Sequence, residues 1–142
     1  MISKFEGEYE FLSNFFPCEV ARDGILYPTV EHAFQAAKTL DNFDKMRIAV
    51  ADTPGKAKRL GRKVTLRPDW EEIKLAVMED CLREKFCADS ELREKLLATG
   101  DEELVEGNWW HDTFWGVCDG VGENNLGKLL MKLRAEYQHK GG

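Results

Sequence analysis

The pattern of apolar and polar positions predicts an unusual helix within residues 27–38. Thr29 is a suitable N-cap, and most positions after it carry alanine or a larger apolar side chain. Because an α-helix has about 3.6 residues per turn, Glu31, Gln35 and Lys38 fall on one face as a single polar row. We therefore expect a largely buried helix that holds an acid, an amide and an amine towards a common cavity. The alternative is that Glu31 and Lys38 each pair with a residue elsewhere in the chain.

Further along, the chain predicts more helices and a little β-structure. Residues on both sides of the turn signal Asp23-Gly24 predict a β-hairpin over 18–27. Lys85 lies near the end of a long amphipathic helix predicted at residues 70–86, and its side chain is expected to face solvent. Apolar periodicity with start and stop signals predicts the remaining helices, at residues 42–51, 54–60 with Gly61 as C-cap, 70–86 with Asp69 as N-cap, 90–99, and from Asn124 or Asn125 through 133.

These elements indicate the fold class α+β, as one mostly helical domain with a small antiparallel β-sheet. The sheet is expected to combine the hairpin with segments near Val105 and Trp115. A length of 142 residues is usual for one domain, and 43% hydrophobic with 32% charged residues is ordinary for a globular protein. We expect a single domain over 1–142, with its core at 5–137 and a frayed tail at 138–142.

Composition also bounds where the protein works. No apolar run approaches the roughly 18 residues of a membrane span, and the N-terminus lacks the apolar core of a signal peptide. We therefore expect a cytoplasmic protein with no membrane contact. The four cysteines have neither Cys-x-x-Cys spacing nor nearby paired histidines, so we expect neither a metal site nor a disulfide framework.

Positive charge is concentrated in one stretch of an acidic chain. The net charge of −6 disfavours a protein whose whole surface embraces duplex nucleic acid, whereas a small anionic ligand needs only a local basic pocket. Residues 56–63 hold the basic cluster, and a solvated helix face is its default explanation. The functional alternative is that Arg59 or Arg62 fixes a phosphate, because a planar guanidinium binds phosphate bidentately.

Two loops add candidate binding residues. Ser13 and Asn14 are embedded in the bulky apolar segment 11–17, where they either point into a pocket or bond the local backbone in a turn. Residues 108–116 pack three tryptophans and a phenylalanine around His111 and Asp112, and Trp115 there offers a plane for ring stacking.

A glycine-rich turn follows the tryptophans. Gly120-x-Gly122 leads into the helix start at Asn124, which is a phosphate-binding geometry, although the pattern does not make the six-residue dinucleotide fingerprint.

The order and spacing of three separated motifs resemble the NADAR family, also called the YbiA-like proteins. The resemblance covers about residues 11–134. It departs after Trp115-Gly116, where Val117-Cys118 stands in place of a glycine- and aspartate-rich turn. This departure leaves open which base of the substrate the pocket accepts. The motifs are Ser13-Asn14-Phe15, Glu31-His32-x-Phe34-Gln35-x-x-Lys38, and Trp115-Gly116 followed by Gly120-x-Gly122-x-Asn124-x-Leu126-Gly127.

The resemblance implies hydrolysis of an N-glycosidic bond without a metal or other cofactor. The implied substrate is a phosphorylated ribosylaminopyrimidine, an intermediate of riboflavin synthesis. One alternative is the removal of ADP-ribose from guanine in DNA or RNA. Another is a module that binds ADP-ribose or NAD without cleaving it.

Chemistry then assigns roles to the candidate residues. Cleavage of a ribosyl C–N bond builds positive charge on the sugar, so Glu31 is expected to activate water and stabilise that charge. Asp112 is the second carboxylate, either for acid/base work or for ribose hydroxyls. Lys38 could bind phosphate, offset the charge of Glu31, protonate the leaving amine, or form an imine, which ranks lower. The expected substrate-binding residues are Ser13, Asn14, Gln35, Arg59, Arg62, Trp115, Gly122 and Asn124.

Overall fold

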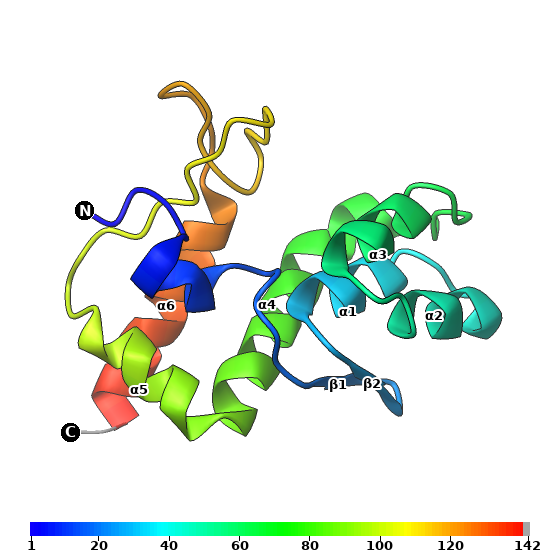
Figure 1. Ribbon diagram of the computed structural model, residues 1–142, viewed down its shortest axis with the longest axis horizontal. Helices are drawn as coiled ribbons and strands as arrows, with labels where there is room; N and C mark the ends of the chain where they lie inside the picture. The colour runs from blue at the N-terminus through cyan, green and yellow to red at the C-terminus, as the bar shows by residue number, and fades with distance from the viewer. Residues whose placement is uncertain (141–142) are drawn as a thin grey trace. The chain divides into compact units, whose positions relative to one another are not determined.

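The computed structural model describes residues 1–140, which form two compact units. The central unit is Asn14–Asp89, and the terminal unit is made of Met1–Ser13 and Ser90–Gly142, of which Gly141 and Gly142 lie outside the described residues. Figure 1 labels the elements of both units. No helix of the described part is long and apolar enough to cross a membrane.

The central unit begins with the predicted hairpin. Strands β1 (Val20–Arg22) and β2 (Ile25–Tyr27) pair antiparallel, and they are the only sheet within residues 1–140. Asp23 and Gly24 connect them with φ angles of 51° and 78°. Both angles are positive, as a tight turn compatible with strand twist requires, which explains why aspartate and glycine stand there.

Four helices complete the central unit: α1 (Val30–Ala36), α2 (Asn42–Ala49), α3 (Pro54–Gly61) and α4 (Trp70–Ala88). Helix α1 packs against α2, α3 and α4, as Figure 1 shows. All of its residues are buried, which confirms the expected buried helix. Against α4 the contact is aromatic, with the rings of Phe34 and Trp70 5.1 Å apart.

Capping follows the sequence in part. Thr29 and Thr53 cap α1 and α3 by accepting the backbone N–H groups of His32 and Lys56. Asp69 makes no capping hydrogen bond to α4, because its carboxylate pairs with the Arg67 guanidinium at 2.7 Å instead.

The predicted C-cap role of Gly61 is wrong, because Arg62 follows Gly61 as the C-cap in ordinary right-handed conformation. Gly61 is the last residue of α3 and is buried. Helix capping therefore does not explain why this residue is glycine.

The expected exposure of Lys85 is also wrong. Its side chain is fully buried in α4, with Nζ 5.8 Å from the ring centroid of Phe16 and 5.2 Å from that of Phe86. Burial lowers the pKa of Lys85 to about 8, while the Cys18 thiol acts in the opposite direction.

The terminal unit contains η1 (Gly7–Leu12), α5 (Ser90–Ala98) and α6 (Asn125–Lys140). The segments near Val105 and Trp115 do not extend the antiparallel sheet. They form isolated parallel bridges, Ile2 with Leu104 and Gly107 with Val117. Of the predicted frayed tail, residues 138–140 are helical and continue α6, and 141–142 lie outside the described residues.

Candidate functional site

The centre of the candidate site is a hydrogen bond within α1. Gln35 Nε2 donates to Glu31 Oε1 at 2.9 Å, and the two residues are only 4% and 7% exposed. The i, i+4 spacing places them on one helix face, as the sequence predicted. An ionised carboxylate can only accept, so the amide must turn its nitrogen towards Glu31. Gln35 therefore orients the carboxylate.

Lys38 stands beside this pair in the turn after α1. Its backbone N–H bonds to the carbonyl of Gln35 at 3.2 Å, and its side chain is half-buried. Burial lowers the pKa of the Lys38 amine, the Glu31 carboxylate raises it, and the cations of Arg62, Lys58 and Lys74 lower it further. One buried carboxylate and three further cations thus act on the charge of Lys38.

Asn14 closes the N-terminal side of α1. Its carbonyl accepts from the backbone N–H of Glu31 at 3.0 Å, and its Nδ2 makes a weak contact with Met78 Sδ at 3.6 Å. Within residues 1–140, Asn14 Oδ1 and Gln35 Oε1 are buried oxygens without a hydrogen-bond partner. Buried acceptors of this kind are suited to donors on a bound ligand, such as hydroxyl or amino groups.

Gly61 brings α3 close to the same amide. A Cβ added to Gly61 would lie 2.0 Å from Gln35 Oε1 and 2.9 Å from Gln35 Cδ. Both distances are too short for real atoms, so only glycine leaves room for the Gln35 side chain in its present position. The sequence did not reveal this function of Gly61.

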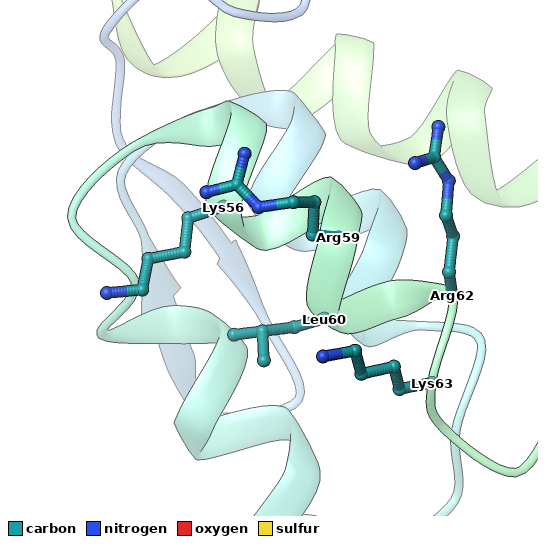
Figure 2. A pocket seen from close by; sticks show the side chains of 5 residues that line it. All are labelled: Lys56, Arg59, Leu60, Arg62 and Lys63. Atoms are coloured by element: carbon teal, nitrogen blue, oxygen red, sulfur yellow. The ribbon is translucent and has the colours of Figure 1, made fainter.

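The basic cluster forms an open basin on α3, shown in Figure 2. Its volume is about 380 Å³. Arg59 and Arg62, both predicted to contact phosphate, are exposed members of its lining. Of these two arginines, Arg62 also lowers the pKa of Lys38, which links it to that amine. The basin is lined by Lys56, Arg59, Leu60, Arg62 and Lys63.

His32 is structural despite its place next to Glu31. Its ring is 1% exposed, with Nε2 2.9 Å from the carbonyl of Ala51 and Nδ1 2.7 Å from the hydroxyl of Thr29. The carbonyl can only accept, so Nε2 carries a proton. His32 therefore fastens the first turn of α1 to Ala51, the second residue after α2.

The terminal unit holds the other predicted carboxylate. Asp112 Oδ1 accepts the backbone N–H groups of Phe114 and Trp115 at 3.2 and 2.9 Å. The Asn108 side chain in turn bonds the backbone of Asp112 in both directions, at 2.9 and 3.0 Å. These bonds make an Asx-type turn that fixes the loop before Trp115. The half-buried Trp115 ring packs edge-on against Phe114 with centroids 4.8 Å apart.

Asn124 is committed to the fold of the terminal unit. Its Nδ2 donates to the carbonyl of Leu104 at 2.9 Å, and its Oδ1 accepts the N–H of Glu106 at 3.0 Å. The residue has a φ of 55°, a conformation that asparagine tolerates better than most residues.

The start of α6 and the preceding glycine also have structural explanations. The backbone N–H groups of residues 124–126 donate to the carbonyls of residues 114–116. Gly122 has a φ of 153°, and a Cβ there would lie 2.1 Å from the carbonyl oxygen of Gly116. These contacts explain Gly122 and the helix start without a phosphate.

The predicted site residues thus fall into two groups. Asn14, Glu31, Gln35, Lys38, Arg59 and Arg62 belong to the central unit, where contacts or charge effects connect all of them except Arg59. Asp112, Trp115, Gly122 and Asn124 lie in the terminal unit, as does Ser13, the C-cap residue of η1. That the two groups face one cavity stays a prediction.

The sequence missed three contributors in the central unit. Lys58 and Lys74 act on Lys38, and Gly61 makes room for Gln35. In the described part of the chain, no three histidine, cysteine, aspartate or glutamate side chains are grouped as metal ligands.

Comparison with known proteins gives consistent matches. A family model described as the NADAR domain matches residues 2–138. The N-glycosidase YbiA of Escherichia coli (strain K12) is 42% identical over 132 residues, covering 91% of this chain and 82% of that protein. A riboflavin biosynthesis protein of Vibrio vulnificus (strain YJ016) is 41% identical over 131 residues, covering 90% of this chain but 35% of that protein. The chain therefore spans about a third of the Vibrio protein.

A solved structure agrees with the predicted fold. The NMR structure of the E. coli protein YbiA matches with a TM-score of 0.86 and 39% identity, over 99% of this chain and 89% of that one. The predicted α+β class, mostly helical with a small antiparallel sheet, is confirmed.

Proposed function

The chain belongs to the NADAR family, and from this premise we propose that it is an N-glycosidase that hydrolyses a ribosyl C–N bond. The proposed substrate is a phosphorylated ribosylaminopyrimidine. Relatives are named N-glycosidases and riboflavin biosynthesis proteins, and both names fit a small ribosylated substrate. The cytoplasmic location expected from the sequence stays a prediction.

One observation carries the proposal: a buried carboxylate, oriented by Gln35, beside an amine whose pKa is lowered. As the C–N bond breaks, positive charge develops on the ribose, and the Glu31 carboxylate stabilises that charge. Glu31 also accepts a proton from the attacking water. The water oxygen then bonds to the anomeric carbon, and the departing nitrogen takes the bond electrons.

Lys38 supplies the matching proton. A lowered pKa makes the ammonium a better acid near neutral pH, so Lys38 can protonate the leaving nitrogen. Arg62, which like Lys58 and Lys74 acts on the charge of Lys38, is proposed to bind the substrate phosphate. The roles predicted for Asp112 and Trp115 in sugar and base binding stay predictions.

A second candidate function is the release of ADP-ribose from guanine in DNA or RNA. The observation that favours it is the basin of Figure 2, which carries more cations than one phosphate monoester needs. Lys56, Arg59 and Lys63 would then contact further phosphates of a longer anion. A non-catalytic ADP-ribose or NAD module would use the same residues without releasing product.

A product assay tests these alternatives. The purified protein is incubated with a ribosylaminopyrimidine phosphate and, separately, with an ADP-ribosylated guanine oligonucleotide. We expect free ribose 5-phosphate from the first and a requirement for Glu31, tested with Glu31→Gln as the matched control. Release of ADP-ribose alone would favour the second function. Binding without either product would favour the module.

A further inference from the structure

Gly61 has a conformation that does not itself require glycine. It lies in the last turn of α3 and is not among the residues with positive φ. Glycine inside a helix is less favourable than alanine, because it loses more backbone freedom on folding. A glycine that is not needed for the backbone indicates that a neighbouring group needs the space.

That neighbouring group is Gln35. The three atoms nearest to a Cβ on Gly61 are Oε1, Cδ and Cβ of Gln35, at 2.0, 2.9 and 3.0 Å. An alanine methyl group must therefore push the end of the Gln35 side chain away. The end of a glutamine side chain is flexible, so this displacement costs little folding energy. It does move the Nε2 that bonds to Glu31 Oε1 at 2.9 Å.

We propose that Gly61 is a positioning residue: by leaving room for the Gln35 carboxamide, it holds the carboxylate of Glu31 in its working orientation. The effect on catalysis rests on the proposed N-glycosidase activity. Gly61 touches Gln35, Gln35 touches Glu31, and only Glu31 acts on the substrate. Helix α3 thus contributes to the site through the shape of its backbone as well as through its cations.

Three variants and one control test this chain of contacts. Gly61→Ala should lower kcat/KM by about 10- to 100-fold, the effect of losing one hydrogen bond to a charged group. Gln35→Ala should have a similar effect. The double variant should lose no more than Gln35→Ala, because the two closest atoms, Oε1 and Cδ of Gln35, are already gone. Gly55→Ala is the matched control in the same helix, where the nearest atom to an added Cβ is Thr53 Oγ1 at 4.0 Å. It should keep full activity.

A second readout does not depend on turnover. The carboxyl ¹³C signal of Glu31 should titrate at a higher pH in Gly61→Ala and in Gln35→Ala than in the wild type, because the charged form has lost a donor. Gly55→Ala should leave this titration unchanged. The titration tests the positioning role of Gly61 even if the wild type cleaves no ribosyl substrate. Failure of this role and failure of the proposed N-glycosidase activity can therefore be told apart.

Two results would overturn the inference. The first is a Glu31 titration in Gly61→Ala identical to that of the wild type. The second is a Gly61→Ala penalty that is as large in the Gln35→Ala background as in the wild type, since Gly61 would then act through another neighbour. If Gly61→Ala alone does not fold, the double variant should fold; failure of both would equally overturn it.

Discussion

Glu31 and Gln35, one helical turn apart, form a buried carboxylate–amide pair with an Nε2–Oε1 distance of 2.9 Å. The pair lies on α1, which packs against α2, α3 and α4. The carboxylate is thus held by a neutral donor, and it also acts on the charge of Lys38.

Glu31→Gln should remain folded and lose activity. The new amide oxygen still accepts from Gln35 Nε2, so the hydrogen bond in the core is kept. The variant can neither accept a proton from water nor stabilise a sugar cation, and we expect kcat to fall by about 10²–10⁴-fold. Thermal unfolding and initial rates measure both effects, with the exposed Glu123→Gln as control. Wild-type turnover by Glu31→Gln would exclude the Glu31 carboxylate as the catalytic base.

Arg62→Gln should shift the alkaline limb of the pH profile. The Arg62 cation lowers the pKa of the Lys38 amine, so its removal raises that pKa. Lys38 acts as a protonated acid in the proposed reaction, and activity should therefore persist to higher pH. Lys58→Gln should shift the limb in the same direction.

The control for this shift is Lys128→Gln, an exposed cation of the terminal unit. A downward shift of the limb in Arg62→Gln would contradict the electrostatic role of Arg62. An unchanged limb together with a higher KM would limit Arg62 to phosphate binding.

Lys85→Met should remove a pH-dependent contribution to the stability of the protein. The pKa of Lys85 is about 8 in the folded protein, against 10.5 as its ordinary value. Below pH 8 both states are protonated and the cost of the buried charge is fully present. Between pH 8 and 10.5 only the unfolded state binds the proton, so the Lys85 contribution to stability rises with pH. The shift corresponds to about 3 kcal/mol, which the rings of Phe16 and Phe86 offset in part.

Urea unfolding of wild type and Lys85→Met between pH 6.5 and 10 checks this linkage. The difference in the free energy of unfolding should be largest at the acidic end and should shrink above pH 8. Comparing the two proteins cancels the opposite effect of Cys81, whose pKa burial raises to about 12 in both. A difference independent of pH would show that Lys85 does not titrate as described.

Asp112→Ala should destabilise the terminal unit more than Asp112→Asn. Alanine removes the acceptor for the N–H groups of Phe114 and Trp115, at a cost of about 1–2 kcal/mol. Asparagine keeps an acceptor oxygen and should cost less. Asp112→Asn removes the charge but keeps an acceptor oxygen for the fold. A loss of turnover in this variant would therefore support the predicted role of Asp112 as second carboxylate, and unchanged turnover would contradict it.

Asn124→Ala should unfold more easily than Asn125→Ala. The first change removes bonds to Leu104 and Glu106 and places alanine at a φ of 55°, for a total of about 2–3 kcal/mol. The second removes a side-chain bond to Phe114. Equal unfolding midpoints in denaturant would argue against the structural role of Asn124 and leave phosphate binding as its explanation.

Local patterns in the sequence predicted the parts of the site that lie within one element. The cap at Thr29 and the row from Glu31 to Lys38 depend only on helix geometry, and the structure has them as expected. The hairpin turn at Asp23-Gly24 is local in the same sense.

What the sequence did not predict depends on contacts between elements. Lys58 and Lys74 reach Lys38 only because α3 and α4 pack on α1. Lys85 is expected at the surface from its place in its own helix, whereas its ammonium lies near the ring of Phe16, which is distant in the sequence. The sequence predicts Asn124 as a helix cap, but its side-chain amide forms hydrogen bonds with the backbone of residues about 20 positions earlier.

Helix α1 has seven residues, fewer than the roughly 12–15 that an isolated helix needs to be even marginally populated in water. The Glu31 carboxylate therefore has no defined position until α2, α3 and α4 have assembled around α1. A peptide copied from residues 29–38 should bind and cleave nothing, however faithful its sequence. Substitutions that merely loosen the surrounding helices will also lower the measured activity. The folded fraction of each variant must therefore be measured together with its rate constant.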